Sequence, residues 1–174
     1  MKRIAFSLFL GIFFLTLQTT LLASLPIQRI RPDIVLILIV YWGLSRSPIS
    51  GGILSIFLGY LMDLFSGHSF GLYTFSRPLL FYLGQIFKGR FYLESILSQF
   101  LFVFLFALFE GFLVLTLLSA LNPVPLGNLT SLFLTFYFPQ SFLTGVISPI
   151  LFLFLNKVSY LLFRYEGIGI RERG

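Results

Sequence analysis

The chain lacks cysteine and contains one histidine and few charged residues, and each shortage excludes a class of protein. Because none of its 174 residues is a cysteine, it forms no disulfide and no thiolate zinc site. The single histidine, His68, cannot form a metal cluster with other histidines, and we expect it to be a solvated loop side chain. Charged residues make up 10% of the sequence, against about 25% in soluble domains, so the chain cannot cover a water-facing surface.

Hydrophobic residues are abundant instead, at 57% of the sequence, and they form runs long enough to cross a membrane. The run from Ser95 to Leu121 holds a single charged residue, Glu110. A bilayer core about 30 Å thick is crossed by a helix of about 20 apolar residues. The sequence therefore predicts an all-α integral membrane protein. The net charge of +6 fits basic cytoplasmic loops better than nucleic-acid binding.

Breaks between the apolar runs predict a bundle of about six transmembrane helices in one domain, residues 1–174. The predicted segments are 4–25, 33–47, 49–65, 72–87, 95–121 and 129–155, followed by a cytoplasmic tail over 156–174. The first run is longer than a signal-peptide core and no A-x-A site follows it, so we expect an uncleaved helix. The second run is too short to span a bilayer unless it extends, tilts or lies inside the bundle. Pro139 and Pro149 are expected to kink the last helix.

The distribution of lysine and arginine predicts that both termini are cytoplasmic. Six crossings place the termini on one side, and basic residues collect in cytoplasmic loops. With the N-terminus inside, nine basic residues are cytoplasmic, namely Lys2, Arg3, Arg46, Lys88, Arg90, Lys157, Arg164, Arg171 and Arg173. Three are outer, namely Arg29, Arg31 and Arg77. Tyr41 and Trp42, near the inner end of the second segment, are interpreted as interfacial anchors.

The third segment carries a stripe in which small residues and one carboxylate recur every four positions. Its members are Gly51, Ser55, Gly59, Asp63 and Gly67. Residues at this spacing lie on one helix face, and small ones allow another backbone to approach closely. The stripe is either an internal packing seam, which we favour, or a groove that faces a partner.

The few charges within the membrane are the candidate site residues. An isolated charge at that depth is costly, so we hypothesise that Asp63 pairs with Arg77 of the next helix. Glu110 has no obvious partner in its own helix, so it is either protonated and hydrogen-bonded or meets a cation from a partner chain. A proton-relay role for Glu110 is the sharper alternative. The sequence has no phosphate-binding loop, no H-E-x-x-H and no nucleophile–base–acid set, so we expect no enzyme, cofactor or metal.

An ordered set of short motifs between residues 18 and 73 resembles the rod shape-determining protein MreD family. The set comprises Gln18-Thr19-Thr20, Pro32-Asp33, Tyr41-Trp42-Gly43, Arg46, Pro48, Gly59-x-x-x-Asp63, Ser66-Gly67 and Gly71-Leu72-Tyr73. The part after Lys88 matches only in hydropathy. The resemblance implies a fold similar to the substrate-binding subunits of energy-coupling-factor vitamin transporters.

The same resemblance implies a non-catalytic component of the bacterial cell-elongation machinery in the inner membrane. Its implied partners are the shape protein MreC and, through it, the MreB filament, the glycosyltransferase RodA and a penicillin-binding transpeptidase. We expect partner contact or helix packing through the small-residue stripe, through Pro32, Gly71, Tyr73 and Glu110, and through an outer charged cluster of Asp33, Asp63 and Arg77. The alternative is a substrate-binding subunit of a vitamin transporter, although Ala5 is followed by Phe9 where such subunits carry Ala-x-x-x-Ala.

Overall fold

The computed structural model describes residues 2–20, 31–66, 71–89, 95–121 and 126–168, and this part of the chain is helical. Its elements are α1 Lys2–Thr20, α2 Ile34–Ser45, α3 Pro48–Ser66, α4 Leu72–Phe87, α5 Ile96–Leu121, α6 Leu126–Leu132, the π-helical turn η1 Phe133–Tyr137, and α7 Phe138–Ile168. Because α6, η1 and α7 follow one another without a break, the described residues form six helical rods. Gly67 and His68 lie outside the described residues.

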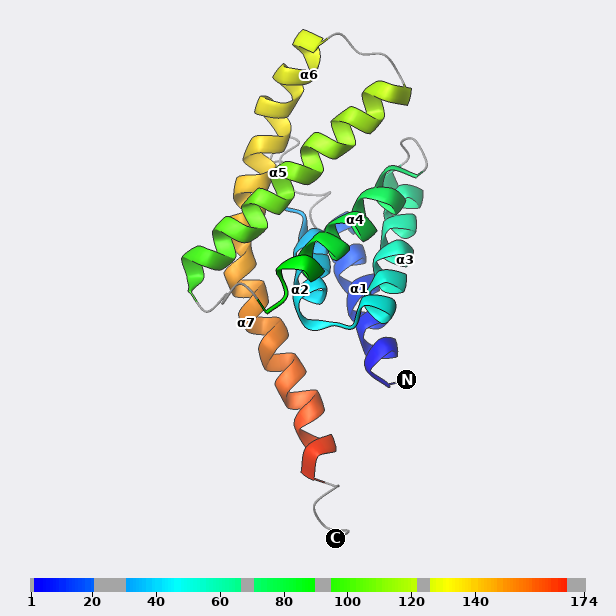
Figure 1. Cartoon of the computed structure of the whole chain (residues 1–174), viewed down its shortest axis with the longest axis vertical. Helices are drawn as coiled ribbons and strands as arrows, with labels where there is room; N and C mark the ends of the chain where they lie inside the picture. The colour runs from blue at the N-terminus through cyan, green and yellow to red at the C-terminus, as the bar shows by residue number, and fades with distance from the viewer. Residues whose placement is uncertain (1, 21–30, 67–70, 90–94, 122–125, 169–174) are drawn as a thin grey trace.

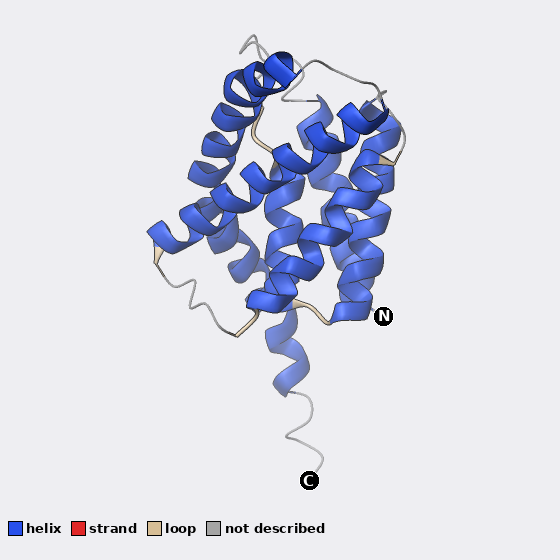
Figure 2. Cartoon of the chain, turned by 45° about the horizontal axis from the view of Figure 1, so that its top comes forward, coloured by secondary structure: helices blue, strands red, loops and turns tan. Residues whose placement is uncertain are grey.

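The six rods run alternately up and down the bundle (Figure 1). The start of α1 and the end of α7 consequently lie toward the same end of the molecule. A second view shows α5 crossing the front of the other helices obliquely (Figure 2). This arrangement is compatible with two termini on one side of a membrane, while the choice of side remains a prediction.

Helix α2 lies inside the bundle, and this position explains how a segment too short to span a bilayer is accommodated. All seven residues from Ile34 to Val40 are buried, and α2 packs against α1, α3, α4, α5 and α7. A helix that is apolar on every side is typical of a protein core or of a membrane span, and here the other helices cover α2. Trp42 is 1% exposed and belongs to this core, so its interpretation as an interfacial anchor is wrong. Tyr41 is half-buried, and its hydroxyl bonds Asn156 Oδ1 of α7 at 2.9 Å.

Three helical stretches are long and apolar enough to cross a membrane, which supports the predicted class. They are Pro48–Phe65, Ile96–Leu121 and Leu129–Tyr160. Two shorter apolar helices, Phe6–Thr20 and Ile34–Ser45, accompany them among the described residues. The chain is thus an all-α membrane protein, and the number of complete crossings remains the prediction made from the sequence.

The last rod contains a wide turn next to Pro139. In η1 the N–H of Phe138 donates to the carbonyl of Phe133, one residue farther back than in an α-helix. Proline has no N–H to offer the preceding turn, and a π-helical turn is a usual place for a helix to absorb such a defect. The rod then continues to Ile168, beyond residue 155, where the predicted sixth segment ended.

Helices α3 and α4 approach each other closely, and glycines on α3 make this close approach possible. A side chain at Gly59 would overlap the carbonyl oxygen of Tyr73, and one at Gly51 would overlap the ring of Phe81. Ser55, between them on the stripe, is fully buried. For these three residues the stripe is an internal packing seam, which is the alternative that we favoured.

Candidate functional site

Asp33 is the first member of a buried polar cluster and lies at the start of α2. Its Oδ1 accepts the N–H of Leu36 at 2.9 Å, so Asp33 caps the helix. Gln18 of α1 donates to the same oxygen at 3.4 Å, and the Asp33 N–H donates to Thr144 Oγ1 of α7 at 3.0 Å. Pro32 precedes it and fixes the chain's entry into α2.

Arg77 of α4 is completely buried and is the cation of the cluster. Its Nη2 lies 2.5 Å from Asp33 Oδ2. Its Nε lies 3.2 Å from Glu110 Oε1, close enough for an ion pair but outside hydrogen-bond geometry. The Tyr73 ring centre lies 5.3 Å from the guanidinium carbon and adds a cation–π contact. Arg77 thus joins two carboxylates that are far apart in the sequence.

Glu110 of α5 completes the cluster and is 5% exposed. Its Oε1 accepts a hydrogen bond from the Ser76 hydroxyl at 3.2 Å. The structure therefore supplies a cation from the same chain, a possibility that the sequence analysis did not consider. We call Asp33, Arg77 and Glu110 the ion-pair node.

The ion-pair node ties five helices together at one depth. Asp33, Arg77 and Glu110 belong to α2, α4 and α5, while Gln18 and Thr144 add α1 and α7. Charges are costly inside a membrane unless they pair with one another. Removing one partner of a buried pair costs more than the pair contributes, because the other charge is left uncompensated. The node therefore makes the relative placement of these helices interdependent.

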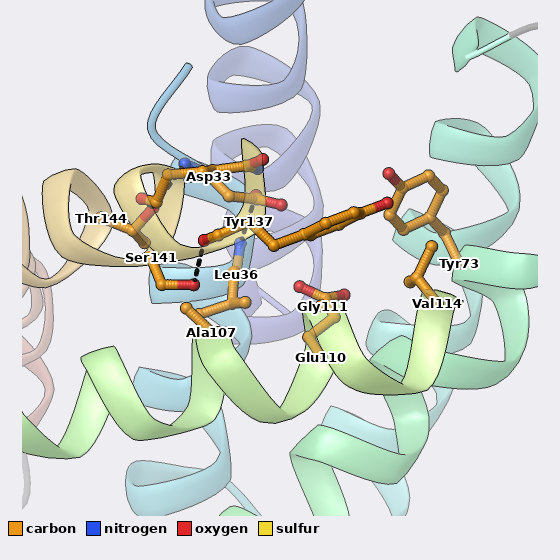
Figure 3. A pocket seen from close by; sticks show the side chains of 11 residues that line it. Asp33, Leu36, Tyr73, Ala107, Glu110, Gly111, Val114, Tyr137, Ser141 and Thr144 are labelled. Atoms are coloured by element: carbon orange, nitrogen blue, oxygen red, sulfur yellow. Dashed lines mark hydrogen bonds between the residues drawn. The ribbon is translucent and has the colours of Figure 1, made fainter. Parts of the chain in front are cut away.

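A small cavity lies beside the node (Figure 3). Its volume is about 20 Å³, and its lining includes both carboxylate residues together with Tyr73, Tyr137 and Thr144. Such a volume holds about one water molecule. Sites for small organic ligands occupy about 300–1,000 Å³, so this cavity does not accommodate a vitamin.

Asp63 does not pair with Arg77, and this hypothesis is overturned. Its carboxylate instead accepts the backbone N–H groups of Gly71, Tyr73 and Thr74 at 3.0, 2.9 and 2.9 Å, and the Thr74 hydroxyl at 2.5 Å. The first turn of any helix presents N–H groups that have no partner within the helix. Asp63 satisfies those of α4, while Gly71 takes the left-handed φ of +102° needed to enter it.

Replacing Asp63 with alanine is expected to destabilise the α3–α4 pair by about 2 kcal/mol, because buried N–H groups at the start of α4 lose their acceptor. The measurement is the thermal midpoint of the detergent-solubilised protein. Asp63→Asn keeps one carbonyl oxygen and should fall between the wild type and Asp63→Ala. Equal midpoints for all three proteins would show that the cap contributes nothing.

The outer charged cluster predicted for partner contact is internal. Asp33, Asp63 and Arg77 are 5%, 1% and 0% exposed, so none of them presents a charge on the outer surface. The sequence did not reveal that Gln18, Ser76 and Thr144 are hydrogen-bond partners of the ion-pair node. Gln18 had been noted only as part of the Gln-Thr-Thr stretch. Polar residues within otherwise apolar helices were the available signal. Within the described ranges, no group of three or more His, Asp or Glu could hold a metal.

Comparison with known proteins found one family. The model of the family described as rod shape-determining protein MreD matches residues 2–162 of the chain. The matched region extends from the start of α1 into α7 and includes every residue of the ion-pair node. No curated protein and no solved structure matches the sequence significantly.

Proposed function

Because the chain belongs to the MreD family of rod shape-determining proteins, we propose that it is a non-catalytic membrane scaffold of the cell-elongation machinery. Membership gives it a part in determining rod shape. In our proposal it binds and positions an MreC-type shape protein in the inner membrane. Through that protein it holds a RodA-type glycosyltransferase and a penicillin-binding transpeptidase where side-wall peptidoglycan is made.

The observation that carries this proposal is the ion-pair node. Its charged groups contact one another, and the cavity beside them, at about 20 Å³, has room for about one water molecule but not for a vitamin-sized ligand. A scaffold needs a bundle whose helices keep fixed relative positions, and a shared buried cation supports that requirement. The same cavity volume speaks against the vitamin-transporter alternative, because the polar centre of the bundle offers no space for such a ligand.

Because Asp33, Asp63 and Arg77 lie inside the bundle, we place the partner-binding surface on the apolar exterior instead. Helix α3 exposes a continuous set of large side chains, namely Ile49, Ile53, Ile56, Phe57, Tyr60, Leu64 and Phe65. Helix association within lipid depends on van der Waals packing, and interhelical hydrogen bonds contribute only about 0.6 kcal/mol each. We therefore expect a partner helix to bind through many small contacts and single substitutions there to weaken binding gradually.

In the bacterium that carries it, loss of this protein is expected to turn rods into rounded cells, and the tagged chain should restore cell width. The physical reason is that the synthases lose their fixed position along the side wall. The same tagged chain, extracted in mild detergent, should retain an MreC-type protein. The measurements are cell width by microscopy and mass spectrometry of the co-purified material.

The matched control is Lys157→Met, which removes an exposed charge in the C-terminal half of α7 and should behave as the wild type in both assays. Unchanged cell width after loss of the protein, together with a vitamin retained on the purified chain, would contradict the scaffold role and favour the transporter.

A further inference from the structure

The ion-pair node brings together two acidic side chains and one basic side chain. Asp33 and Glu110 each carry a carboxyl group, and within the described ranges Arg77 is the one cation that contacts them. All three side chains are buried. A charge without a partner is costly in a membrane interior, and a buried group usually becomes neutral instead of remaining charged and unpaired. The charge count therefore indicates that the node takes up one positive charge that its own side chains do not supply.

Asp33 has the surroundings of an ionised carboxylate. Its Oδ1 accepts the N–H of Leu36 at 2.9 Å and a hydrogen bond from Gln18 at 3.4 Å, and Arg77 Nη2 lies 2.5 Å from Oδ2. Each of these neighbours is a donor, and the carboxylate is the form of the side chain that only accepts hydrogen bonds. Asp33 also lies at the N-terminus of α2, where the helix dipole favours negative charge. Asp33 is therefore the anion that Arg77 balances.

Glu110 has fewer donors around it. Its Oε1 accepts one hydrogen bond, from the Ser76 hydroxyl at 3.2 Å. Arg77 Nε lies 3.2 Å from the same oxygen but outside hydrogen-bond geometry. Glu110 lies at the middle of α5, so neither end of that helix acts on its charge. Of the two carboxyl groups, Glu110 is consequently the one that is suited to hold a proton.

The elements that pack against α5 bring no second cation to Glu110 in the described part of the chain. These elements are α2, α4, η1 and α7. Besides Asp33 and Arg77, the titratable side chains at the cavity are Tyr73 of α4 and Tyr137 of η1, and both tyrosines are neutral at physiological pH. Helix α7 adds three uncharged polar residues to the lining, namely Gln140, Ser141 and Thr144.

The cavity beside Glu110 suits a proton better than a metal ion. Glu110 points into it from α5 (Figure 3). A volume of about 20 Å³ has room for about one water molecule, which can accept a hydrogen bond from a carboxyl group. A metal cation would need several oxygen ligands in the same space, whereas a proton needs a single acceptor.

We propose that Glu110 is a proton-binding site whose carboxyl group holds one proton at neutral pH and so makes the ion-pair node neutral. The proton is on Oε2, because Oε1 accepts the Ser76 hydroxyl. Loss of the proton leaves two carboxylates at one guanidinium, and their repulsion acts between α5 and the start of α2. The inference goes beyond the scaffold function and does not depend on it.

Infrared spectroscopy of the full chain in nanodiscs tests the site. Labelling the glutamate carboxyl groups with carbon-13 separates their bands from those of aspartate. A protonated carboxyl group shows a carbonyl stretch that carboxylates lack. We expect the wild type to show this labelled band at neutral pH, with the intensity of one of the four glutamates, and Glu110→Gln to lose it. A wild type without the band, or a band that persists in Glu110→Gln, would overturn the proposal.

Two matched acid-to-amide substitutions give an independent test. Glutamine resembles a protonated glutamate in shape and charge, so Glu110→Gln should keep a thermal midpoint close to that of the wild type in detergent at neutral pH. Asp33→Asn should reduce the recovery of folded protein severalfold, because it removes the anion that balances Arg77, although asparagine can still cap α2. Equal changes in the two variants, whether large or small, would contradict the assignment of the proton to Glu110.

Discussion

Replacing Arg77 with methionine is expected to prevent accumulation of the folded protein. The substitution keeps a long side chain but leaves Asp33 and Glu110 without a shared cation inside the bundle. Breaking a buried ion pair from one side costs about 3–5 kcal/mol, a large part of the stability of most domains. The measurement is the amount of monodisperse protein recovered from membranes, followed by its thermal midpoint in detergent.

The loss should depend on the unpaired carboxylates. Adding Asp33→Asn and Glu110→Gln to Arg77→Met neutralises the node and should recover part of the stability, because whole buried networks can often be replaced at little cost. Arg77→Lys keeps the charge but lacks the fork that reaches two carboxylates, so it should be intermediate. Lys157→Met controls for loss of a positive charge. If the triple variant is no more stable than Arg77→Met, the node is not an electrostatic unit.

Replacing Gly59 with leucine is expected to separate α3 from α4 and to abolish the folded bundle. Even a single methyl group at Gly59 would overlap the Tyr73 carbonyl oxygen and crowd the Cα of Thr74, and backbone cannot move aside as a side chain can. Overpacking of a well-packed core costs about 1–3 kcal/mol for small insertions, so Gly59→Ala should already destabilise the protein and Gly59→Leu more. Thermal midpoint and retention on a sizing column report both effects.

Gly52 of the same helix provides the matched control. A methyl group there would meet the hydroxyl of Tyr82 at 2.5 Å, but that tyrosine is 48% exposed and can rotate outward. Gly52→Ala should therefore cost much less than Gly59→Ala. Comparable losses at the two positions would contradict a special role for the close approach to α4, because the gain in helix propensity from glycine to alanine is the same at both.

The elements that the sequence revealed were those governed by local patterns. Apolar runs and proline or glycine breaks located the helices, because burial in lipid requires long apolar segments. The four-residue spacing of Gly51, Ser55 and Gly59 indicated a close helix contact, which the structure assigns to α4. The MreD motifs indicated the family that the comparison then identified.

The node could not be predicted because it depends on how helices are rotated relative to one another. Asp33, Arg77 and Glu110 come from three helices, and no local spacing relates them. Asp63 and Arg77 are neighbours in sequence order, which made their pairing plausible, but the start of α4 offers Asp63 nearer donors in its backbone. Trp42 lies near a helix end, yet the enclosing helices bury it.

The enclosure of α2 has a consequence for how the protein is made. Helix α2 leaves the ribosome early, but most helices that cover it are synthesised later, and the node partners of Asp33 arrive with α4 and α7. A 12-residue segment cannot rest in lipid alone across the bilayer. The fully enclosed position of α2 is consequently reached only after α4, α5 and α7 have been synthesised.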